Sequence, residues 1–229
     1  MTQNIEISVI TPKLRLEQVL KEAGIEDATT VSRLTVRGTI AEDDLRYIRI
    51  KMGKTLNELN LSDVEIEREN NPKRDFEKDD IFELAEHIVT SCAKFVFSDC
   101  TGLTFISLPN WMTFIDTAAF ARCTELTSIV FPQSILEIAE WAFFGCVGLT
   151  SVTIPNTLKL IGHRAFYGCN GLTSVTIPNS VTEIVESAFE DCPAYFTVHP
   201  DNPIYTSEDG KLKKKRNPQN RKHRRFSKK

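Results

Sequence analysis

The sequence lacks the features that define several large protein classes. No run of 18 apolar residues occurs in the 229-residue chain, which excludes a transmembrane helix. There is no glycine-rich phosphate loop, no Cys-x-x-Cys pair and no His-Glu-x-x-His motif, and the four histidines are scattered. Because the signatures of catalysis are missing, we expect a protein that is not an enzyme and holds no cofactor or metal.

The first residues also lack the basic and apolar stretches of a signal peptide, since they read Met-Thr-Gln-Asn-Ile-Glu. Two locations agree with this observation. One is the cytoplasm, and the other is the cell exterior, reached with a leader that these residues do not include.

Negative charge is missing from the last residues. No acidic residue follows Asp209, whereas 11 of the 28 Lys and Arg residues lie in 211–229. The chain before this segment therefore holds 31 acidic and 17 basic side chains, a net charge of −14. With few apolar residues, the segment 211–229, here called the basic tail, is expected to be disordered.

Three interpretations of the basic tail stay open. It binds a polyanion (nucleic acid, a heparin-like chain or an anionic surface), it is a solvated extension without a partner, or it is an aberrant end that replaces ordinary coils. The first interpretation assigns binding to six residues: Lys213, Lys214, Lys215, Arg216, Arg224 and Arg225.

Cysteine marks the dominant feature of the sequence, an internal repeat. Five of the six cysteines recur at one fixed interval along the chain: Cys100, Cys123, Cys146, Cys169 and Cys192. After each of the first four, the same columns hold Leu, Val or Ile, then Pro, further aliphatic residues and an Ala-Phe pair. One such unit cannot bury its apolar side chains alone, so the units are expected to stack as a solenoid.

Each unit combines two halves. Leu-x-x-Val-x-Ile alternates with period two and predicts a short strand, which Pro ends because it cannot continue a hydrogen-bonded ladder. Stacked strands lie about 4.8 Å apart and form a parallel sheet on one face. The second half predicts a turn, a brief extended piece and a helical turn at Ala-Phe.

The cysteine column has a structural explanation. Each thiol occupies the same buried position in successive coils, where a free cysteine behaves as a small apolar residue. Stacked side chains at the coil repeat are too far apart for disulfides, and a line of thiols is not the tetrahedron that zinc requires. We expect the column to be reduced, and Cys92, outside the register, to be the odd thiol.

These residues point to a family. Leu-Thr-Ser-Val-Thr-Ile-Pro-Asn-Ser-Val-Thr-Glu-Ile at 172–184 closely resembles the BspA-type leucine-rich repeat of bacterial surface proteins, and the match is strong over 100–192. The resemblance implies a solenoid that binds or adheres, a secreted or cell-surface location, and a protein or glycan ligand. After Asp209-Gly210 the chain departs from the pattern with Lys-Leu-Lys-Lys-Lys-Arg, so capping of that end in the family's manner is in doubt.

Two upstream segments resemble the N-terminal cap of such proteins, Val31-Ser-Arg-Leu-Thr-Val-Arg-Gly-Thr-Ile40 and Leu56-Asn-Glu-Leu-Asn-Leu-Ser62, which repeat the Leu-x-Leu type of strand spacing. The residues around them also predict short helices. Leu16, Val19, Leu20 and Ala23 have helical spacing, with Thr11-Pro12 expected to begin the helix and Gly24 to end it. Thr39 and Glu42 read as a capping box before a second helix, whose apolar stripe is Leu45, Ile48 and Met52.

The predicted fold class is therefore an α/β repeat solenoid: a leucine-rich repeat with a parallel sheet on one face, 23-residue coils and an N-terminal cap of helices and strands. The predicted organisation is a cap with half-repeats at 1–61, an inserted charged loop at 62–80, the solenoid with its exit segment at 81–210, and the basic tail at 211–229. The sequence makes no prediction of oligomeric state.

Side chains between the buried strand positions should point out of the sheet in two ladders. The first ladder is Arg33, Glu58, Phe105, Ser128, Ser151 and Ser174. The second is Thr35, Asn60, Ser107, Val130, Thr153 and Thr176. We expect ligand binding on this face, through Arg33, Glu58, Asn60, Phe105, Ser107, Val130, Thr153 and Thr176.

Departures from the Ser and Thr consensus are the informative positions. Phe105 and Val130 put apolar area among small polar neighbours, as at a modest protein interface. Trp111, expected to be partly exposed, is a further binding candidate. For Phe105 and Trp111 an alternative is packing against the 62–80 loop. Structural roles are favoured for Trp141 and for His163, which is expected at the surface.

Overall fold

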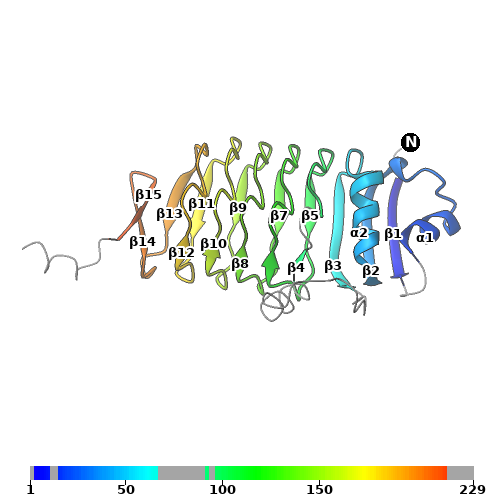
Figure 1. Cartoon of the computed structure of the whole chain (residues 1–229), viewed down its shortest axis with the longest axis horizontal. Helices are drawn as coiled ribbons and strands as arrows, with labels where there is room; N and C mark the ends of the chain where they lie inside the picture. Colours follow the sequence, from blue (N-terminus) through cyan, green and yellow to red (C-terminus); the bar gives the residue numbers. More distant parts are fainter. Residues whose placement is uncertain (1–2, 11–14, 67–90, 93–95, 216–229) are drawn as a thin grey trace, which may run out of the picture.

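The protein is an elongated stack of coils, with two helices at one end and a small hairpin at the other (Figure 1). The computed structural model describes residues 3–10, 15–66, 91–92 and 96–215. The predicted solenoid with a parallel sheet is confirmed. Helices in the described residues belong to the cap alone, so the repeat coils are strands and turns rather than α/β units.

The N-terminal cap alternates strands with short helices. Its elements are β1 (Gln3–Ile10), α1 (Leu16–Glu22), the 3-10 turn Ala28–Thr30, β2 (Val31–Ile40), α2 (Glu42–Tyr47), the π-helical turn Ile48–Met52 and β3 (Glu58–Ile66). Its apolar stripes are buried: Leu16, Leu20, Ile48 and Met52 are all at most 1% exposed. Burial of these side chains stabilises helices that are too short to persist alone.

Buried Asp44, 3% exposed, accepts hydrogen bonds from backbone N–H groups at the start of both helices. Helix α1 begins at Leu16, and the predicted cap at Thr11-Pro12 lies outside the described residues. One carboxylate oxygen of Asp44 accepts a hydrogen bond from the Leu16 N–H at 2.9 Å, and the other accepts from the Ala41 N–H at 2.9 Å. The Thr39 capping box is therefore wrong, because pairing with β3 keeps Thr39 in strand β2. Gly24, at φ +79°, follows α1 as predicted.

Two parallel sheets run along the stack. The first has the order β1-β2-β3-β5-β7 and continues, where β9 contacts β7, as a separate three-stranded sheet β9-β11-β13; both parts are called the first sheet below. The second has the order β12-β10-β8-β6-β4. The first-sheet strands of the coils are β5 (Phe105–Ser107), β7 (Ser128–Val130), β9 (Ser151–Thr153), β11 (Ser174–Ile177) and β13 (Tyr195–Val198). The second-sheet strands are β4 (Ser91–Cys92), β6 (Phe114–Ile115), β8 (Glu137–Ile138), β10 (Leu160–Ile161) and β12 (Glu183–Ile184).

The core is a set of columns, as the repeat predicted. The phenylalanines of the Ala-Phe column stack with ring centroids 5.4, 5.2, 5.1 and 5.1 Å apart: Phe97, Phe120, Phe143, Phe166 and Phe189. Phe97 opens this column, which confirms that residues 96–100 belong to a coil. Aligned rings and buried aliphatic side chains therefore form the core between the sheets, which a single coil could not bury alone.

The expected helical turn at Ala-Phe is wrong. Each turn instead places one residue in the left-handed region, with φ between 52° and 62° at Ala118, Trp141, Arg164 and Ser187. The N–H groups of Phe120 and Phe143 donate to Ala142 and Ala165 of the next coil, at 2.8 and 2.7 Å. Hydrogen bonds between coils thus replace those of a helix, because stacking satisfies the backbone at this position.

One predicted boundary, at the start of the inserted loop, needs correction. Residues 62–66 are not loop but the end of β3, whose Val64 is buried and pairs with Gly38 of β2. The remainder of the expected loop, 67–80, lies outside the described residues.

The basic tail is not disordered at its start. Residues Lys211–Lys214 form β15, which pairs antiparallel with β14 (Tyr205–Glu208). Asp209 and Gly210, with φ of +51° and +73°, make the tight turn between them, which is the backbone geometry that an Asp-Gly hairpin prefers. Leu212 packs against the core, so this hairpin caps the C-terminal end. Residues 216–229 lie outside the description.

Candidate ligand-binding face

Strand pairing places the two predicted ladders in register on the first sheet. Arg33 pairs with Glu58, Glu58 with Phe105, and Phe105 with Ser128. In the second ladder, Thr35, Asn60, Ser107 and Val130 pair in that order. Farther along the sheet, Ser151 and Thr153 pair with Ser174 and Thr176. The predicted alignment is confirmed from β2 to β7 and between β9 and β11, and the binding role of these residues stays a prediction.

The join between cap and coils creates the unusual part of this face. Strand β3 pairs directly with β5, although the whole segment 67–104 separates them in the chain. A strand with charged side chains and a strand with an aromatic side chain therefore become neighbours, with Glu58 beside Phe105. The face between β2 and β7 carries charged and apolar side chains, whereas β9 and β11 present Ser and Thr.

Sequence reasoning missed residues at both ends of the face. On β1, Asn4 pairs with Arg33 and Glu6 with Thr35, which extends both ladders by one strand. Alternation of Ile5, Ile7 and Val9 was the available signal for this strand. At the other end, Tyr195 pairs with Ser174 and is 60% exposed. Tyr195 follows its partner by less than one full coil, so it fell outside the repeat columns.

Ion pairs order the charged part of the face. The Arg33 guanidinium lies 2.8 Å from a Glu58 carboxylate oxygen. Arg37 reaches Glu6 on one side and Asp63, at 3.4 Å, on the other. All five side chains are substantially solvent-exposed, so the pairs hold the side chains in place more than they stabilise the fold.

A shallow depression lies over this charged part. Its volume is about 450 Å³, and its lining includes Asn4, Glu6, Arg33, Glu58, Asn60 and Phe105. Phe105 is half-buried at its edge, and Val130, on the neighbouring strand, is 50% exposed. The depression thus combines a paired acid and base, an amide and an aromatic ring with an accessible aliphatic side chain nearby.

Trp111 is not among the residues that line this depression, and its contacts are with strand β3 and the core. Its indole N–H donates a hydrogen bond to the carbonyl oxygen of Val64 at 2.5 Å, and its ring is half-buried against the core. Val64 belongs to the segment that the sequence assigned to the 62–80 loop. This contact agrees with the packing alternative for Trp111, although its partner is a strand, and a binding role for Trp111 stays a prediction.

The remaining aromatic and histidine candidates lie on the turn side of the coils. Trp141 is 38% exposed at a left-handed position. His163 is at the surface as predicted, with Nδ1 2.9 Å from the Glu186 carbonyl oxygen. Nearby, Phe144 and Tyr167 stack at 5.4 Å, and the Arg164 guanidinium lies 5.3 Å from the Tyr167 ring centroid.

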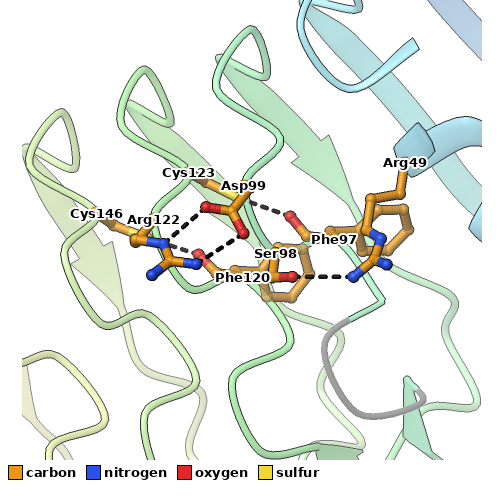
Figure 2. A network of polar contacts seen from close by, with 8 residues as sticks. All are labelled: Arg49, Phe97, Ser98, Asp99, Phe120, Arg122, Cys123 and Cys146. Carbon is orange, nitrogen blue, oxygen red and sulfur yellow. Dashed lines mark hydrogen bonds and ion pairs between the residues drawn. The ribbon is translucent and has the colours of Figure 1, made fainter. Parts of the chain in front are cut away.

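The five cysteines of the column are free, as predicted. Each thiol from Cys123 onward donates to a phenylalanine carbonyl oxygen of the preceding coil, and Figure 2 shows two of these bonds, from Cys123 to Phe97 and from Cys146 to Phe120. Burial raises the pKa of Cys100 and of Cys146 to about 12. The side chain of Cys92 lies outside the described residues.

Figure 2 also shows how the cap is attached to the coils. Arg49 of the cap donates to the Ser98 hydroxyl at 3.1 Å. Arg122 bonds both carboxylate oxygens of Asp99, at 2.7 and 2.9 Å, which ties one coil to the next. This hydrogen bond from the guanidinium holds the pKa of Asp99 below its usual value.

The described lysines of the basic tail are partly engaged. Lys213 pairs with Glu208, and the ammonium group of Lys215 donates to the Asn202 carbonyl oxygen at 2.6 Å. Lys214 is exposed on β15. Arg216, Arg224 and Arg225 lie outside the described residues, so polyanion binding stays a prediction.

Two further absences hold for the part of the chain that the structure describes. No group of three or more His, Cys, Asp or Glu side chains is placed to hold a metal ion. No helix there is long and apolar enough to cross a membrane.

Comparison with known proteins identifies the family to which the repeat belongs. Residues 83–206 match the BspA type leucine-rich repeat region, in six copies. No curated protein matches the chain.

Solved structures of bacterial leucine-rich repeat proteins are similar to this chain. One from Eubacterium ventriosum has 19% identity and a TM-score of 0.55 over 79% of this chain and 43% of that chain, which supports the fold. The T. pallidum leucine-rich repeat protein has 39% identity, over 45% and 49%, with a TM-score of 0.45. A leucine-rich cell surface protein from Faecalibacterium prausnitzii has 34% identity, over 50% and 31%, with a TM-score of 0.47. The match spans less than half the length of each of these proteins.

Proposed function

Because the chain belongs to the BspA type leucine-rich repeat family, we propose that it is a non-catalytic interaction module that binds a protein ligand on its first sheet. Repeats of this family generally serve protein interaction or adhesion, and such proteins are typically scaffolds without catalysis. A cell-surface or secreted location accompanies this proposal and has the same support.

One observation carries the choice of face. The pairing of β3 with β5 assembles Glu58, Phe105 and Val130 within three neighbouring strands, beside the Arg33–Glu58 ion pair. Aromatic and arginine side chains surrounded by polar neighbours are the composition of protein interface hot spots. The coils farther along offer Ser and Thr hydroxyls there, which provide hydrogen bonds at the rim of an interface rather than its centre.

A protein ligand is favoured over a glycan by the character of this patch. Val130, 50% exposed, is an aliphatic side chain that gains from burial against another apolar group. Arg33 and Glu58 already neutralise each other, so the patch does not select a highly charged ligand. A flat sheet with a depression of about 450 Å³ also suits a broad protein contact better than an enclosed small molecule.

The test is a triple variant, Glu58→Gln with Phe105→Ser and Val130→Thr. Quantitative affinity capture from candidate host or neighbouring cells compares it with the unmodified chain, followed by binding measurements on each purified partner. Loss of a hot spot of about 2 kcal/mol lowers affinity about 30-fold. The matched control is Leu136→Ser with Val147→Thr, which changes exposed apolar side chains on other surfaces.

The outcomes separate the alternatives. Unchanged affinity in a folded triple variant removes the sheet-face proposal. A glycan-array signal that the triple variant loses would replace the protein ligand by a glycan on the same face. Binding that persists in the triple variant but falls steeply with salt and disappears without residues 211–229 would assign the ligand to the basic tail.

A further inference from the structure

The C-terminal hairpin covers the edges of both sheets but leaves the turn side of the last coil, residues 185–193, open. At the second sheet, the N–H group of Ile184 donates to the Tyr205 hydroxyl at 2.7 Å. At the first sheet, the Phe196 N–H group donates to a carbonyl oxygen of the hairpin turn at 2.8 Å. A groove of about 640 Å³, here called the end groove, lies between the turn side and β15. Cys192 on its wall is therefore only partly buried, whereas the four earlier cysteines of the column are at most 2% exposed.

The end groove exposes backbone donors that every earlier coil uses. The N–H groups of the four stacked phenylalanines before Phe189 donate to alanine carbonyl oxygens of the next coil, at 2.7–2.8 Å. A second series, two positions later in each coil, runs from Asp99 to Gly168 at 2.7–3.0 Å. The next members of the two series are Phe189 and Asp191, and no backbone carbonyl of a described residue accepts from either. In every earlier coil, the acceptors of these two donors are carbonyl oxygens two residues apart in one stretch of chain.

The base of the end groove is apolar. The Phe189 ring ends the stacked column, with the Phe166 ring at 5.1 Å on one side and Phe196 edge-on at 5.1 Å. Leu212 of β15 also lines the groove, and both Phe189 and Leu212 are only partly buried. An apolar side chain placed here removes further apolar area from water, which favours binding.

One wall of the end groove is basic. Among the described residues that line it, β15 contributes Lys211, Lys213 and Lys214 against the one carboxylate of Glu190. Lys213 is paired with Glu208, whereas Lys211 and Lys214 form no ion pair with a described residue. This wall therefore attracts a negatively charged ligand and repels a positively charged one.

We propose that the end groove binds an extended acidic segment of a partner protein, which adds to the stack where a further coil would lie. Carbonyl oxygens two residues apart in this segment accept from the N–H groups of Phe189 and Asp191. Its apolar side chains cover the end of the phenylalanine column, and its carboxylates lie near Lys211 and Lys214. Peptides add to open sheet edges in a similar manner, with main-chain hydrogen bonds for affinity and alternate side chains for specificity.

Charge selects this occupant over two others. The rest of the basic tail, 216–229, carries seven Lys and Arg residues and no acidic residue, so the lysines of β15 repel it. The hairpin of a second copy presents the same lysines and is repelled for the same reason. An inorganic anion would match the charge, but it would leave the apolar base uncovered.

The first experiment uses a synthetic peptide with alternating acidic and apolar residues, acetyl-Asp-Val-Glu-Val-Asp-Val-Glu-amide. It is labelled with fluorescein and titrated with the full chain by anisotropy. A matched peptide with Ser in place of Val keeps the charge, and a second with Lys in place of Asp and Glu reverses it. We expect the alternating acidic peptide to bind at least about tenfold more tightly than either control. Equal binding of the serine peptide would overturn the proposal, because charge alone would then explain it.

The second experiment changes the groove. Ser187 lines it at φ +62°, and Trp141 occupies the same column at φ +57°, so this turn accommodates a tryptophan. Ser187→Trp should fill the groove and lower peptide affinity at least about tenfold, whereas the matched control Ser187→Ala leaves it unchanged. Lys211→Glu with Lys214→Glu should lower it by about tenfold as well. Unchanged affinity in either folded variant contradicts the proposal.

Hydrogen exchange locates the bound peptide. Saturating peptide should slow exchange of the Phe189 and Asp191 N–H groups at least about tenfold, and it should not change that of Phe143, which is bonded to the next coil. Removal of residues 216–229 should leave peptide affinity unchanged. Loss of binding on that truncation would assign the peptide to the basic tail, and faster exchange at Phe189 without peptide would make the tail itself the occupant. Either result would overturn the proposal.

The sheet-face interface is tested independently of the end groove. The triple variant Glu58→Gln, Phe105→Ser and Val130→Thr changes none of the residues that line the end groove. It should bind the acidic peptide as the unmodified chain does, so failure of one proposal is distinguishable from failure of the other.

Discussion

Asn202 carries the attachment of the C-terminal hairpin, and its replacement by alanine should release that hairpin. The side chain is 0% exposed. Its amide donates to the carbonyl oxygens of Pro178 and Val181, at 2.7 and 3.0 Å. Its carbonyl oxygen accepts from the N–H groups of Ile204 and Tyr205, at 2.9 and 2.7 Å. One side chain thus joins the last regular coil to the segment that leads into β14.

The size of the effect follows from these four bonds. Asn202→Ala leaves two carbonyl oxygens and two N–H groups without their partner, and each buried group of this kind costs about 1–3 kcal/mol. Water entering the vacated space satisfies part of the set. We therefore expect a loss of about 3–5 kcal/mol in the local stability of the hairpin.

Native-state hydrogen exchange is the suitable assay, because ends of repeat arrays can unfold separately from the centre. The N–H groups of Tyr205 and Lys215 are both hydrogen-bonded in the hairpin region. Their exchange should accelerate about 150- to 4,000-fold in Asn202→Ala, the equivalent of that loss at about 1.4 kcal/mol per tenfold. The control Asn170→Ala changes an exposed asparagine, for which about 0.5 kcal/mol or less is expected.

A loss below about 1 kcal/mol would refute this reasoning, since it would mean that the four groups find other partners at little cost. Equal acceleration of amides in β7 and in the hairpin would also refute it, because the hairpin would then not open as a local unit.

Two other predictions concern the column and the coil-to-coil ion pair. Phe143→Ala removes a fully buried ring with neighbours at 5.2 and 5.1 Å, so urea unfolding should show a loss of about 3–5 kcal/mol. Half-buried Phe144, stacked on one side only, should lose about 1–2 kcal/mol, and equal losses would contradict the column argument. Arg122→Ala should lose no more than about 1 kcal/mol at neutral pH. Because the Asp99 pKa is lowered in the fold, this difference should be present at neutral pH and vanish as the pH falls through that lowered pKa, and a difference that persists once Asp99 is protonated contradicts the assignment.

The repeat was predictable in detail because the same residue types recur at a constant interval along the chain. A constant step along the chain puts chemically similar side chains at equal positions, so columns such as that of Cys123 and Cys146 follow without coordinates. Period-two alternation identified which strand positions face outward, and the ladder from Phe105 to Ser128 was aligned correctly.

The N-terminal cap and the basic tail were less predictable, because in each of them two local sequence patterns favour different structures. Thr39 and Glu42 satisfy a capping pattern, but Thr39 belongs to a paired strand, and buried Asp44 performs the capping from another position. In the basic tail, lysine density indicated disorder. The Asp209-Gly210 turn signal and the apolar Leu212 outweighed it, because the open end of the last coil gives this hairpin a surface to cover.

By itself, the sequence determined the coil, its length, its buried columns and the family, because each is a periodic property of neighbouring residues. Only the tertiary structure decided that β3 lies beside β5, that Trp111 bonds Val64, and that Cys192 is the accessible thiol of its column. Each of these depends on which segment lies against which at an end of the repeat. Periodicity carries no information there, and packing and hydrogen-bond satisfaction select the arrangement.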